Sequence, residues 1–165
     1  MRERQITKEY FAEVVEEQKD LMLRLAYSVL HNVADAEDAV SEAILKAWTK
    51  RNHLRDKGKM KNWLLRIVLN DSCNIIRRRR KEKLVEDAQS YIEKVTEMYE
   101  EEESGIWQLV LKLREEYRGV VVMHYYGELS VKEISKVLRI PEGTVKTRLH
   151  RARTELKDMW SQLGE

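Results

Sequence analysis

The first half of the chain carries three stripes of apolar residues at the 3.6-residue spacing of amphipathic helices. The first stripe follows Thr7, whose hydroxyl suits a helix N-cap, and it stops at the polar segment HNVADAED. Its members are Tyr10, Phe11, Val14, Leu21, Met22, Leu25 and Val29. The pattern predicts one long helix with an inward face.

A second helix is predicted after this break, with Asp35 as its cap and Asp38 near its positive N-terminal end. Its inward face is formed by Ala39, Val40, Ala43, Ile44, Ala47 and Trp48. The opposite side carries Glu37, Ser41, Glu42 and the apolar Leu45. The stretch RNHLRDKGKM then has the composition of a loop, with Gly58 as its flexible point.

A third helix is predicted from about Lys59 into the four consecutive arginines that follow Ile76. One side carries Met60, Trp63, Leu64, Ile67, Val68 and Ile75, and another carries Leu65, Leu69 and Ile76. Apolar residues on two sides indicate that the first half of this helix packs against two neighbours.

Helical periodicity weakens from residue 82 to 105, where acidic residues dominate, so this stretch is predicted to be a linker. Apolar spacing then resumes and predicts a second core of Ile106, Leu109, Val110, Leu113, Val120, Val121 and Met123. The expected fold is all-α, with two small helical domains at 1–81 and 106–165 and an acidic linker at 82–105.

The C-terminal domain ends in two predicted helices joined by the turn RIP. Ser130 and Glu133 have the spacing of a capping box, and Pro141 suits the start of the last helix. A rotation of about 100° per residue places Val145, Leu149, Ala152 and Leu156 on one buried stripe. The opposite side and its flanks present Lys146, Thr147, Arg148, His150, Arg151, Arg153 and Thr154. This arrangement is the helix-turn-helix pattern.

The basic side of the last helix has two interpretations. In an arbitrary amphipathic helix, such a side simply faces solvent. The capped preceding helix, the turn and the absence of acidic residues from Thr144 to Thr154 favour a helix that reads DNA instead. Arginine and lysine can reach guanine acceptors or phosphates, and a threonine methyl can contact a thymine methyl.

The 165-residue chain has a net charge of only +2, but its charges are segregated. Bases dominate from Lys50 to Lys81, acids from Glu82 to Glu103, and bases lead again after Lys132. This order predicts two modules that bind a polyanion, separated by a different segment. A further hypothesis is that the four glutamates at 100–103 fold against the basic surfaces in the free protein and suppress DNA binding.

Patterns typical of catalysis or of cofactor binding are not found in the sequence. The four histidines are scattered, no serine or cysteine has a base at a patterned spacing, and there is no zinc motif or phosphate-binding glycine loop. We therefore expect no enzymatic activity, no metal and no cofactor. Cys73 is the only cysteine and no apolar run could cross a bilayer, so a cytoplasmic protein without direct membrane insertion is expected.

Three segments together resemble a known family. GELSVKEISKVLRIPEGTVKTRLHRARTEL resembles the promoter-reading C-terminal domain of bacterial sigma factors, and DAEDAVSEAILKAW followed by WLLRIVLNDSCNIIRRRR resembles their N-terminal domain. The resemblance covers roughly residues 10–80 and 106–158. With both sets in this order around an acidic linker, the chain is similar to the extracytoplasmic-function sigma factors, group four of the sigma-70 family.

The resemblance implies one set of residues that binds core RNA polymerase and two sets that bind promoter elements. The family's acidic helix docks on the clamp helices of the largest subunit of core RNA polymerase, which points to Asp35, Asp38, Ser41, Glu42 and Leu45. The next loop and basic helix capture a flipped base and contact the −10 element, which points to Arg55, Lys59, Lys61, Asn70, Arg77 and Arg78. The family's −35 contacts fall on Lys146, Thr147, Arg148, His150, Arg151 and Arg153.

Some of these residues keep a second interpretation. Asp35 and Asp38 can cap their helix as well as bind the polymerase, and Trp63 is more readily a core residue than a platform for a base. Arg139 stands in the turn where related sequences often have glycine. A positive φ at this arginine would cost about 1 kcal/mol.

The implied function is promoter-specific transcription initiation by core RNA polymerase. The resemblance also implies contact with the flap of the second-largest polymerase subunit and with an anti-sigma factor. The alternative is a stand-alone helix-turn-helix regulator that binds duplex operators, and a DNA-processing enzyme is a third hypothesis. The regulator hypothesis leaves the acidic helix and the first basic helix unexplained.

Overall fold

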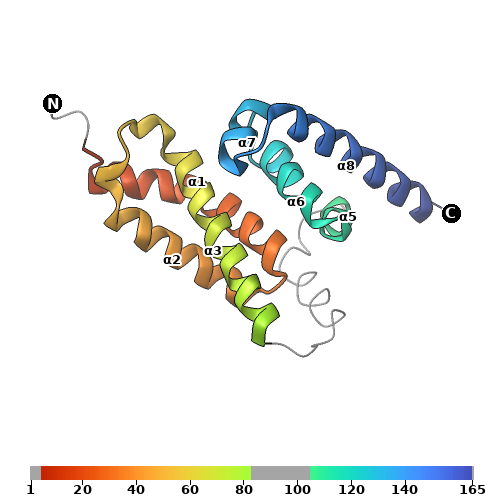
Figure 1. Ribbon diagram of the computed structural model, residues 1–165, viewed down its shortest axis with the longest axis horizontal. Coiled ribbons are helices and arrows are strands. Elements are labelled where there is room, and N and C mark those ends of the chain that lie inside the picture. Colours follow the sequence, from red (N-terminus) through yellow and green to blue (C-terminus); the bar gives the residue numbers. More distant parts are fainter. Residues whose placement is uncertain (1–4, 83–104, 165) are drawn as a thin grey trace.

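The computed structural model describes residues 5–82 and 105–164, and every regular element in those two ranges is helical. Figure 1 shows two groups of helices side by side. The N-terminal module consists of α1 (Lys8–Leu30), α2 (Val33–Thr49) and α3 (Met60–Glu82). The C-terminal module consists of α5 (Ile106–Lys112), α6 (Glu115–Val121), the π-helix η4 (Val122–Tyr126), α7 (Val131–Leu138) and α8 (Glu142–Leu163). The all-α prediction is confirmed, whereas the hypothesis on residues 100–103 falls outside the described residues.

Local capping rules explain where the first two helices begin. The Thr7 side chain accepts a hydrogen bond from the backbone N–H of Tyr10 at 3.1 Å, so the predicted cap of α1 is confirmed. The cap of α2 is Asn32, whose side chain accepts from the backbone N–H of Asp35 at 3.0 Å. The prediction that Asp35 is the cap was wrong, because the helix already begins at Val33.

The connection between α2 and α3 is more ordered than the predicted loop. It contains two short 3-10 turns, η2 (Arg51–His53) and η3 (Lys57–Lys59). Asp56 caps the second turn by accepting from the backbone N–H of Gly58 at 3.0 Å. No glycine among the described residues has a positive φ, so Gly58 does not use the left-handed backbone region here, and its role as a flexible point stays a prediction.

The core of the N-terminal module has small residues on α2 and large residues on α3. Four alanines of α2 are almost completely buried, which lets the neighbouring helices approach closely: Ala36, Ala39, Ala43 and Ala47. Leu64 and Leu65 of α3 are both fully buried, although they project from different sides of the helix. The prediction that the first half of α3 packs on two sides is therefore consistent with the structure.

The core of the C-terminal module follows the prediction with one exception. The buried residues include Leu109, Val110, Leu113, Val120, Val121 and Met123, as expected. Ile106, however, is 43% exposed, and the next residue, Trp107, is buried in its place. Helix α5 begins at Ile106, and its phase turns Trp107 inward, where the indole meets the Tyr126 ring at 5.1 Å between centroids.

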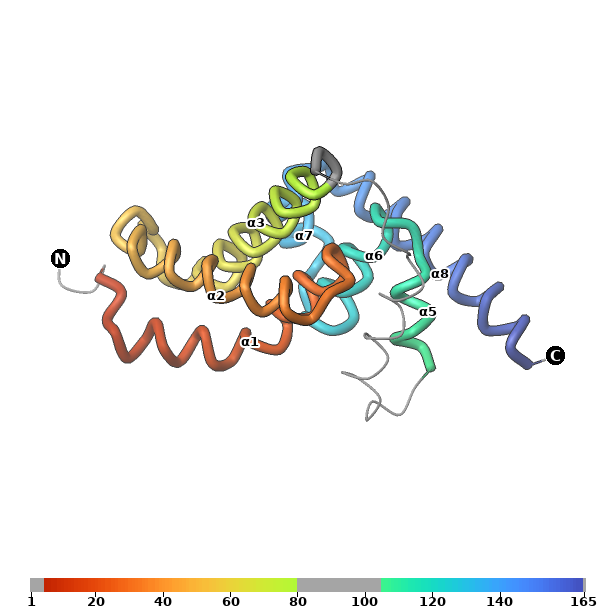
Figure 2. Tube along the Cα trace, turned by 90° about the horizontal axis from the view of Figure 1, so that it is seen from below, coloured from red at the N-terminus to blue at the C-terminus, as the bar shows by residue number. Residues whose placement is uncertain are grey.

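The two modules pack against each other. Helices α1 and α3 contact α6, η4 and α7, and the two views agree on this arrangement (Figures 1 and 2). Gly127, just after η4, lies so close to α1 that a Cβ atom would stand 2.8 Å from Leu21 Cδ2. This position has no room for a larger side chain without a shift of the neighbouring atoms.

Candidate nucleic-acid interface

The helix-turn-helix is built by α7, a tight turn and α8. Ser130 Oγ accepts from the backbone N–H of Glu133 at 3.1 Å, and Glu133 Oε1 accepts from the backbone N–H of Ser130 at 3.2 Å. The predicted capping box is confirmed, and the hydrogen bond from the Ser130 backbone holds the pKa of Glu133 below its usual value. Helix α7 ends at Arg139, which has φ 56° and ψ 46°. The positive φ considered from the sequence is therefore present.

Helix α8 has the two predicted sides. Val145, Leu149 and Ala152 are at most 2% exposed, while Leu156 is half-buried near the edge of the module. Most of the predicted DNA-facing residues are exposed: Lys146, Thr147, His150, Arg151, Arg153 and Thr154. Arg148 is half-buried. The burial pattern leaves a continuous polar and basic surface along α8.

Some α8 side chains already have partners within the chain. Arg153 donates its Nε–H to the Tyr125 hydroxyl at 2.6 Å. The Thr147 hydroxyl donates to the Gly143 carbonyl one turn back at 2.9 Å. An open groove lies between α6 and the first turns of α8, lined by Glu116, Tyr117, Pro141, Gly143, Thr144, Thr147, Arg148 and Arg151. The groove continues the basic surface toward α6.

The second basic surface lies on the N-terminal module. Five of its predicted residues are exposed: Arg55, Lys59, Asn70, Arg77 and Arg78. Lys61 is half-buried instead, and its ammonium donates to the Gly127 carbonyl of the C-terminal module at 2.9 Å. The structure therefore divides this set into residues open to solvent and one that is bound to the other module.

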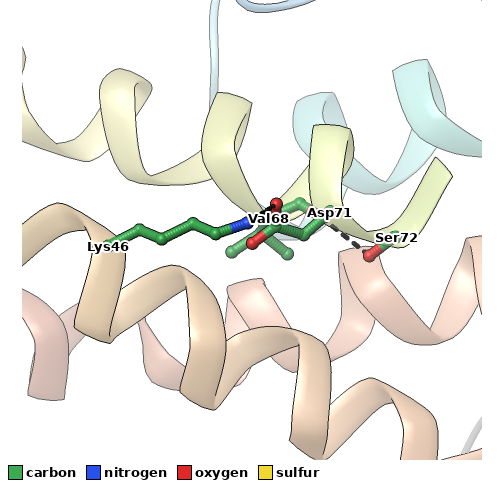
Figure 3. A network of polar contacts seen from close by, with 4 residues as sticks. All are labelled: Lys46, Val68, Asp71 and Ser72. Carbon is green, nitrogen blue, oxygen red and sulfur yellow. Dashed lines mark hydrogen bonds and ion pairs between the residues drawn. The ribbon is translucent and has the colours of Figure 1, made fainter. Parts of the chain in front are cut away.

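An open cleft between α2 and α3 adds residues that the sequence analysis missed. Its lining consists of Glu42, Lys46, Asp71, Asn74, Arg77 and Arg78. The Lys46 ammonium lies 2.7 Å from Asp71 Oδ1, and Ser72 donates to the Val68 carbonyl at 2.7 Å (Figure 3). Lys46 and Asp71 are 25 residues apart, so no local motif could have paired them. This ion pair ties α2 to α3 beneath the two arginines.

The predicted acidic surface of α2 is also formed. Asp38, Ser41 and Glu42 are exposed, and Leu45 is 66% exposed despite its apolar side chain. Asp35 differs from these four, because its carboxylate forms an ion pair with Arg79 of α3. Four of the five predicted residues thus share an open face, and the fifth links the two helices.

Other classes of site are not found in the described part of the chain. Within residues 5–82 and 105–164, no three histidine, cysteine or acidic side chains cluster as metal ligands would. Among the same residues, no helix combines the length and the apolar character that a membrane span requires.

Sequence comparison identifies both modules. Residues 14–82 match the family described as Sigma-70 region 2, and residues 104–156 match Sigma-70, region 4. The ECF RNA polymerase sigma factor SigW of Bacillus subtilis (strain 168) is 35% identical over 163 residues, which cover 89% of this chain and 87% of the relative. The RNA polymerase sigma factor SigV of the same organism is 27% identical, over 92% of each chain.

Structural comparison agrees with the sequence matches. The sigma factor RpoE of Bartonella quintana, solved in complex with the anti-sigma factor NepR, superposes with a TM-score of 0.75 at 20% identity, over 94% of this chain and 98% of that one. The sigma factor CnrH, solved with the cytosolic domain of CnrY, gives a TM-score of 0.69 at 23% identity, over 94% of this chain and 90% of CnrH. Because the two region matches follow each other in one chain that is 35% identical to SigW, the protein belongs to the extracytoplasmic-function sigma factors of the sigma-70 family, which direct promoter-specific transcription initiation.

Proposed function

We propose that this sigma factor divides promoter recognition between its two modules while α2 holds it on core RNA polymerase. In this proposal residues 1–81 serve the −10 element, residues 106–165 serve the −35 element, and residues 82–105 connect them. The observation that carries the proposal is that α8 is buried along one side and exposed along the other. A helix buried along Val145, Leu149 and Ala152 and basic along its open side has the chemistry and shape for a major groove.

The −35 element would be read from the exposed side of α8. Lys146, Thr147, His150 and Arg151 form the centre of this surface, with Arg148 and Arg153 on its flanks. Arg151 also lines the groove between α6 and α8, so its guanidinium can serve either a guanine edge or a phosphate. We assign it to a base because it lies on the outward side of the helix.

The −10 element would be held by the open residues of the second basic surface: Arg55, Lys59, Asn70, Arg77 and Arg78. The arginines suit phosphates, and the Asn70 amide can both donate to and accept from the edge of an unpaired base. Lys61 belongs to this set by position, but it must first leave the Gly127 carbonyl. Capture of an unpaired base stabilises the open duplex.

Polymerase binding would use Asp38, Ser41, Glu42 and Leu45, with Asp35 acting through its ion pair to Arg79. Exposed acids around an exposed leucine suit the clamp helices of the largest subunit if these present basic and apolar side chains. The C-terminal module would contact the flap of the second-largest subunit. Each module binds promoter DNA weakly alone, and tethering both to one polymerase raises their effective concentration.

An anti-sigma factor is a further partner in this proposal. The solved structures of RpoE and CnrH, whose folds this chain shares, contain an anti-sigma factor and the cytosolic domain of CnrY, respectively. The chain would act in the cytoplasm, where core RNA polymerase transcribes, and it would not be an enzyme itself.

Run-off transcription with purified core polymerase tests the proposal. We expect initiation at a cognate promoter only when this chain is present. Arg151→Ala should weaken recognition of that promoter by about 1–3 kcal/mol if the arginine makes a bidentate base contact. The matched control is Lys157→Ala, which removes an exposed base from α8 outside the predicted contact set.

Two outcomes would contradict parts of the proposal. Equal losses for Arg151→Ala on cognate and scrambled −35 sequences would make Arg151 a phosphate contact. A chain that does not co-migrate with core polymerase, yet binds duplex operators unaided, would be a stand-alone helix-turn-helix regulator.

A further inference from the structure

Tyr125 is an exposed aromatic residue that lies beside the helix-turn-helix but outside it. It belongs to the π-helix η4, where the backbone N–H of Gly127 donates to the Val122 carbonyl, five residues back, at 3.1 Å. The Tyr125 side chain is 51% exposed, whereas Val122 and Met123 of the same turn are buried. π-Helical turns are rare and often occur at functional sites. Core packing therefore does not explain why a large aromatic side chain stands at this position.

Tyr125 and Arg153 of α8 together form a group of hydrogen-bond donors. Arg153 Nε donates to the Tyr125 hydroxyl at 2.6 Å, and the guanidinium carbon lies 5.9 Å from the centroid of the same ring. This contact uses one N–H of the guanidinium and leaves its two terminal amino groups available. Because the hydroxyl oxygen accepts from Arg153, its own proton is directed elsewhere and is available to a second acceptor. Both side chains are exposed, so the pair presents one cationic and one neutral donor to solvent.

The position of Arg153 along α8 indicates which acceptor the pair would meet. At a rise of 1.5 Å per residue, Arg153 lies about 16 Å along the helix axis from Glu142, the first residue of α8. A recognition helix contacts base edges with its N-terminal residues, in a major groove only about 12 Å wide. A side chain this far along the helix has passed the base edges and faces the sugar-phosphate backbone at the border of the groove.

The chemistry of the pair fits a phosphate. The planar fork of a guanidinium matches two phosphate oxygens, and tyrosine hydroxyls commonly donate to phosphates in protein–DNA complexes. A different arginine on this module shows the contrast, because Arg114 pairs with the Glu155 carboxylate at 3.6 Å. Arg153 contacts a neutral hydroxyl instead, so this contact does not cancel its positive charge.

We propose that Tyr125 and Arg153 together bind one phosphate of the DNA backbone beside the −35 element. This inference rests on the proposed function, because that proposal places α8 in the −35 major groove. It adds a residue from outside the helix-turn-helix to the DNA contacts, and it assigns Arg153 to the backbone instead of to a base. The Tyr125 hydroxyl has two roles: it fixes the orientation of the guanidinium, and it donates to the phosphate itself. A clamp of this kind fixes the register of α8 in the groove.

A purely structural link between η4 and α8 is the alternative role of the pair, and Tyr125→Phe separates the two. This variant keeps the ring and removes only the hydroxyl. The matched control is Tyr126→Phe, which removes a hydroxyl from the next residue, whose ring packs on Trp107 at 5.1 Å between centroids. Binding is measured with the polymerase holoenzyme and a fluorescein-labelled duplex that carries a promoter at which this chain initiates in run-off transcription.

The two members of the pair should affect binding in different ways. Tyr125→Phe should weaken binding about fivefold, because it removes one hydrogen bond to a charged group at an exposed site. The loss should be the same when the −35 sequence is scrambled, and the slope of log affinity against log salt should not change, because the hydroxyl is neutral. Arg153→Ala should weaken binding about tenfold and reduce that slope by about 0.9, the value for one phosphate contact. Tyr126→Phe should leave both quantities unchanged.

Single methylphosphonate substitutions along the backbone of the −35 element identify the phosphate. Each substitution replaces one charged phosphate by a neutral group. At one position the loss caused by Tyr125→Phe should shrink to less than about twofold, because the variant and the modified DNA lack the same interaction. The loss caused by Arg153→Ala should shrink at that same position.

Several outcomes would overturn the inference. Tyr125→Phe with wild-type affinity would show that the hydroxyl does not contact DNA, and a loss confined to the cognate −35 sequence would assign it to a base. A loss that persists at every methylphosphonate position, together with a lower free energy of unfolding, would make the pair a structural link. Failure of the proposed function has a different signature, since the wild-type chain would then support no promoter-specific run-off transcription at all.

Discussion

Helices α3 and α8 are both long, basic and amphipathic, yet more of the described cations on α3 are bound to other parts of the chain. On α3, Lys61 and Arg66 donate to carbonyls of the other module, and Arg79 pairs with Asp35. Arg77 and Arg78 of α3 remain exposed. On α8, Lys146 and Arg151 are exposed, and Arg153 donates to the Tyr125 hydroxyl. The basic residues of a helix therefore do not by themselves indicate how many of its cations are free to bind DNA. Their availability depends on what packs beside the helix.

The difference follows from where each helix lies. Helix α3 is enclosed by α1, α2 and α7, so both its apolar sides and part of its polar side have neighbours (Figure 2). Helix α8 lies at the edge of the molecule and contacts only elements of its own module among those with extensive packing, namely α5, α6 and α7. A central helix can couple the two modules, whereas a peripheral helix can present one side to a ligand.

The largest effect that this comparison predicts is on the free energy of unfolding. Leu64→Ala on α3 removes a fully buried side chain and should cost about 2–5 kcal/mol. Leu156→Ala, on the half-buried end of α8, should cost only about 1 kcal/mol because water already reaches this site. Urea unfolding followed by circular dichroism measures both. Similar costs for the two variants would remove the proposed distinction between a central and a peripheral helix.

A second prediction concerns the ion pair that anchors α3. Lys46→Ala leaves the Asp71 carboxylate, which is only 7% exposed, without its partner at 2.7 Å. Because Lys46 itself is half exposed and water can enter, we expect a loss of about 2 kcal/mol, less than for a deeply buried pair. The corresponding change on α8, Lys146→Ala, should alter the unfolding free energy by less than about 0.5 kcal/mol.

The double variant Lys46→Ala with Asp71→Asn separates charge from packing. It removes the unpaired carboxylate, so it should be more stable than Lys46→Ala alone. If the double variant is the less stable of the two, Asp71 stabilises the module through contacts other than the ion pair.

The sequence predicted those features that depend on a few neighbouring residues. The Thr7 cap, the capping box of Ser130 and Glu133 and the buried stripe of α8 each depend on spacing within one or two turns. The predictions were wrong where two nearby residues could take the same structural role. Asn32 and Asp35 can both cap α2, and Ile106 and Trp107 can both begin the core of α5, so helix phase decides between them.

The candidate site was less predictable than the fold, because its charges pair over long distances in the sequence. Lys46 meets Asp71 across 25 residues, and Arg66 meets Lys136 across 70. Periodicity indicates which side of a helix is apolar, but it contains no information on which cation a distant carbonyl will bind. The exposed surface of α8 was predictable because none of the other described helices covers it.

A third prediction uses pH to weaken the contact between the modules. Burial, and then the positive charge of Arg118, lower the pKa of His31 from 6.5 to about 4. Above pH 6.5 the imidazole is neutral in both the folded and the unfolded chain. As the pH falls toward 4, the unfolded chain binds a proton at His31 that the folded chain does not. The free energy of unfolding should therefore fall by up to about 2 kcal/mol between pH 7 and pH 5.

Urea unfolding at pH 7 and pH 5 measures this loss, and His31→Asn is the control. His31 has φ 51°, a conformation that asparagine tolerates, and the amide does not titrate. The variant should lose less stability than the wild type over this range. An identical pH dependence would mean that other groups account for it.

The smallest predicted effect concerns Arg139, in the turn between α7 and α8. The positive charge of this residue acts on an arginine of α3. Arg139 has φ 56°, and its positive charge lowers the pKa of Arg66 on α3, after the larger effect of burial. Arg139→Gly relieves the backbone strain and removes this repulsion, although glycine also gains entropy in the unfolded chain. Arg139→Gln removes the charge but keeps the strain, so the Gly variant should exceed the Gln variant by about 0.5–1 kcal/mol in unfolding free energy. If Gln stabilises as much as Gly, repulsion between α3 and this turn, rather than the left-handed backbone, is what limits the stability of the junction.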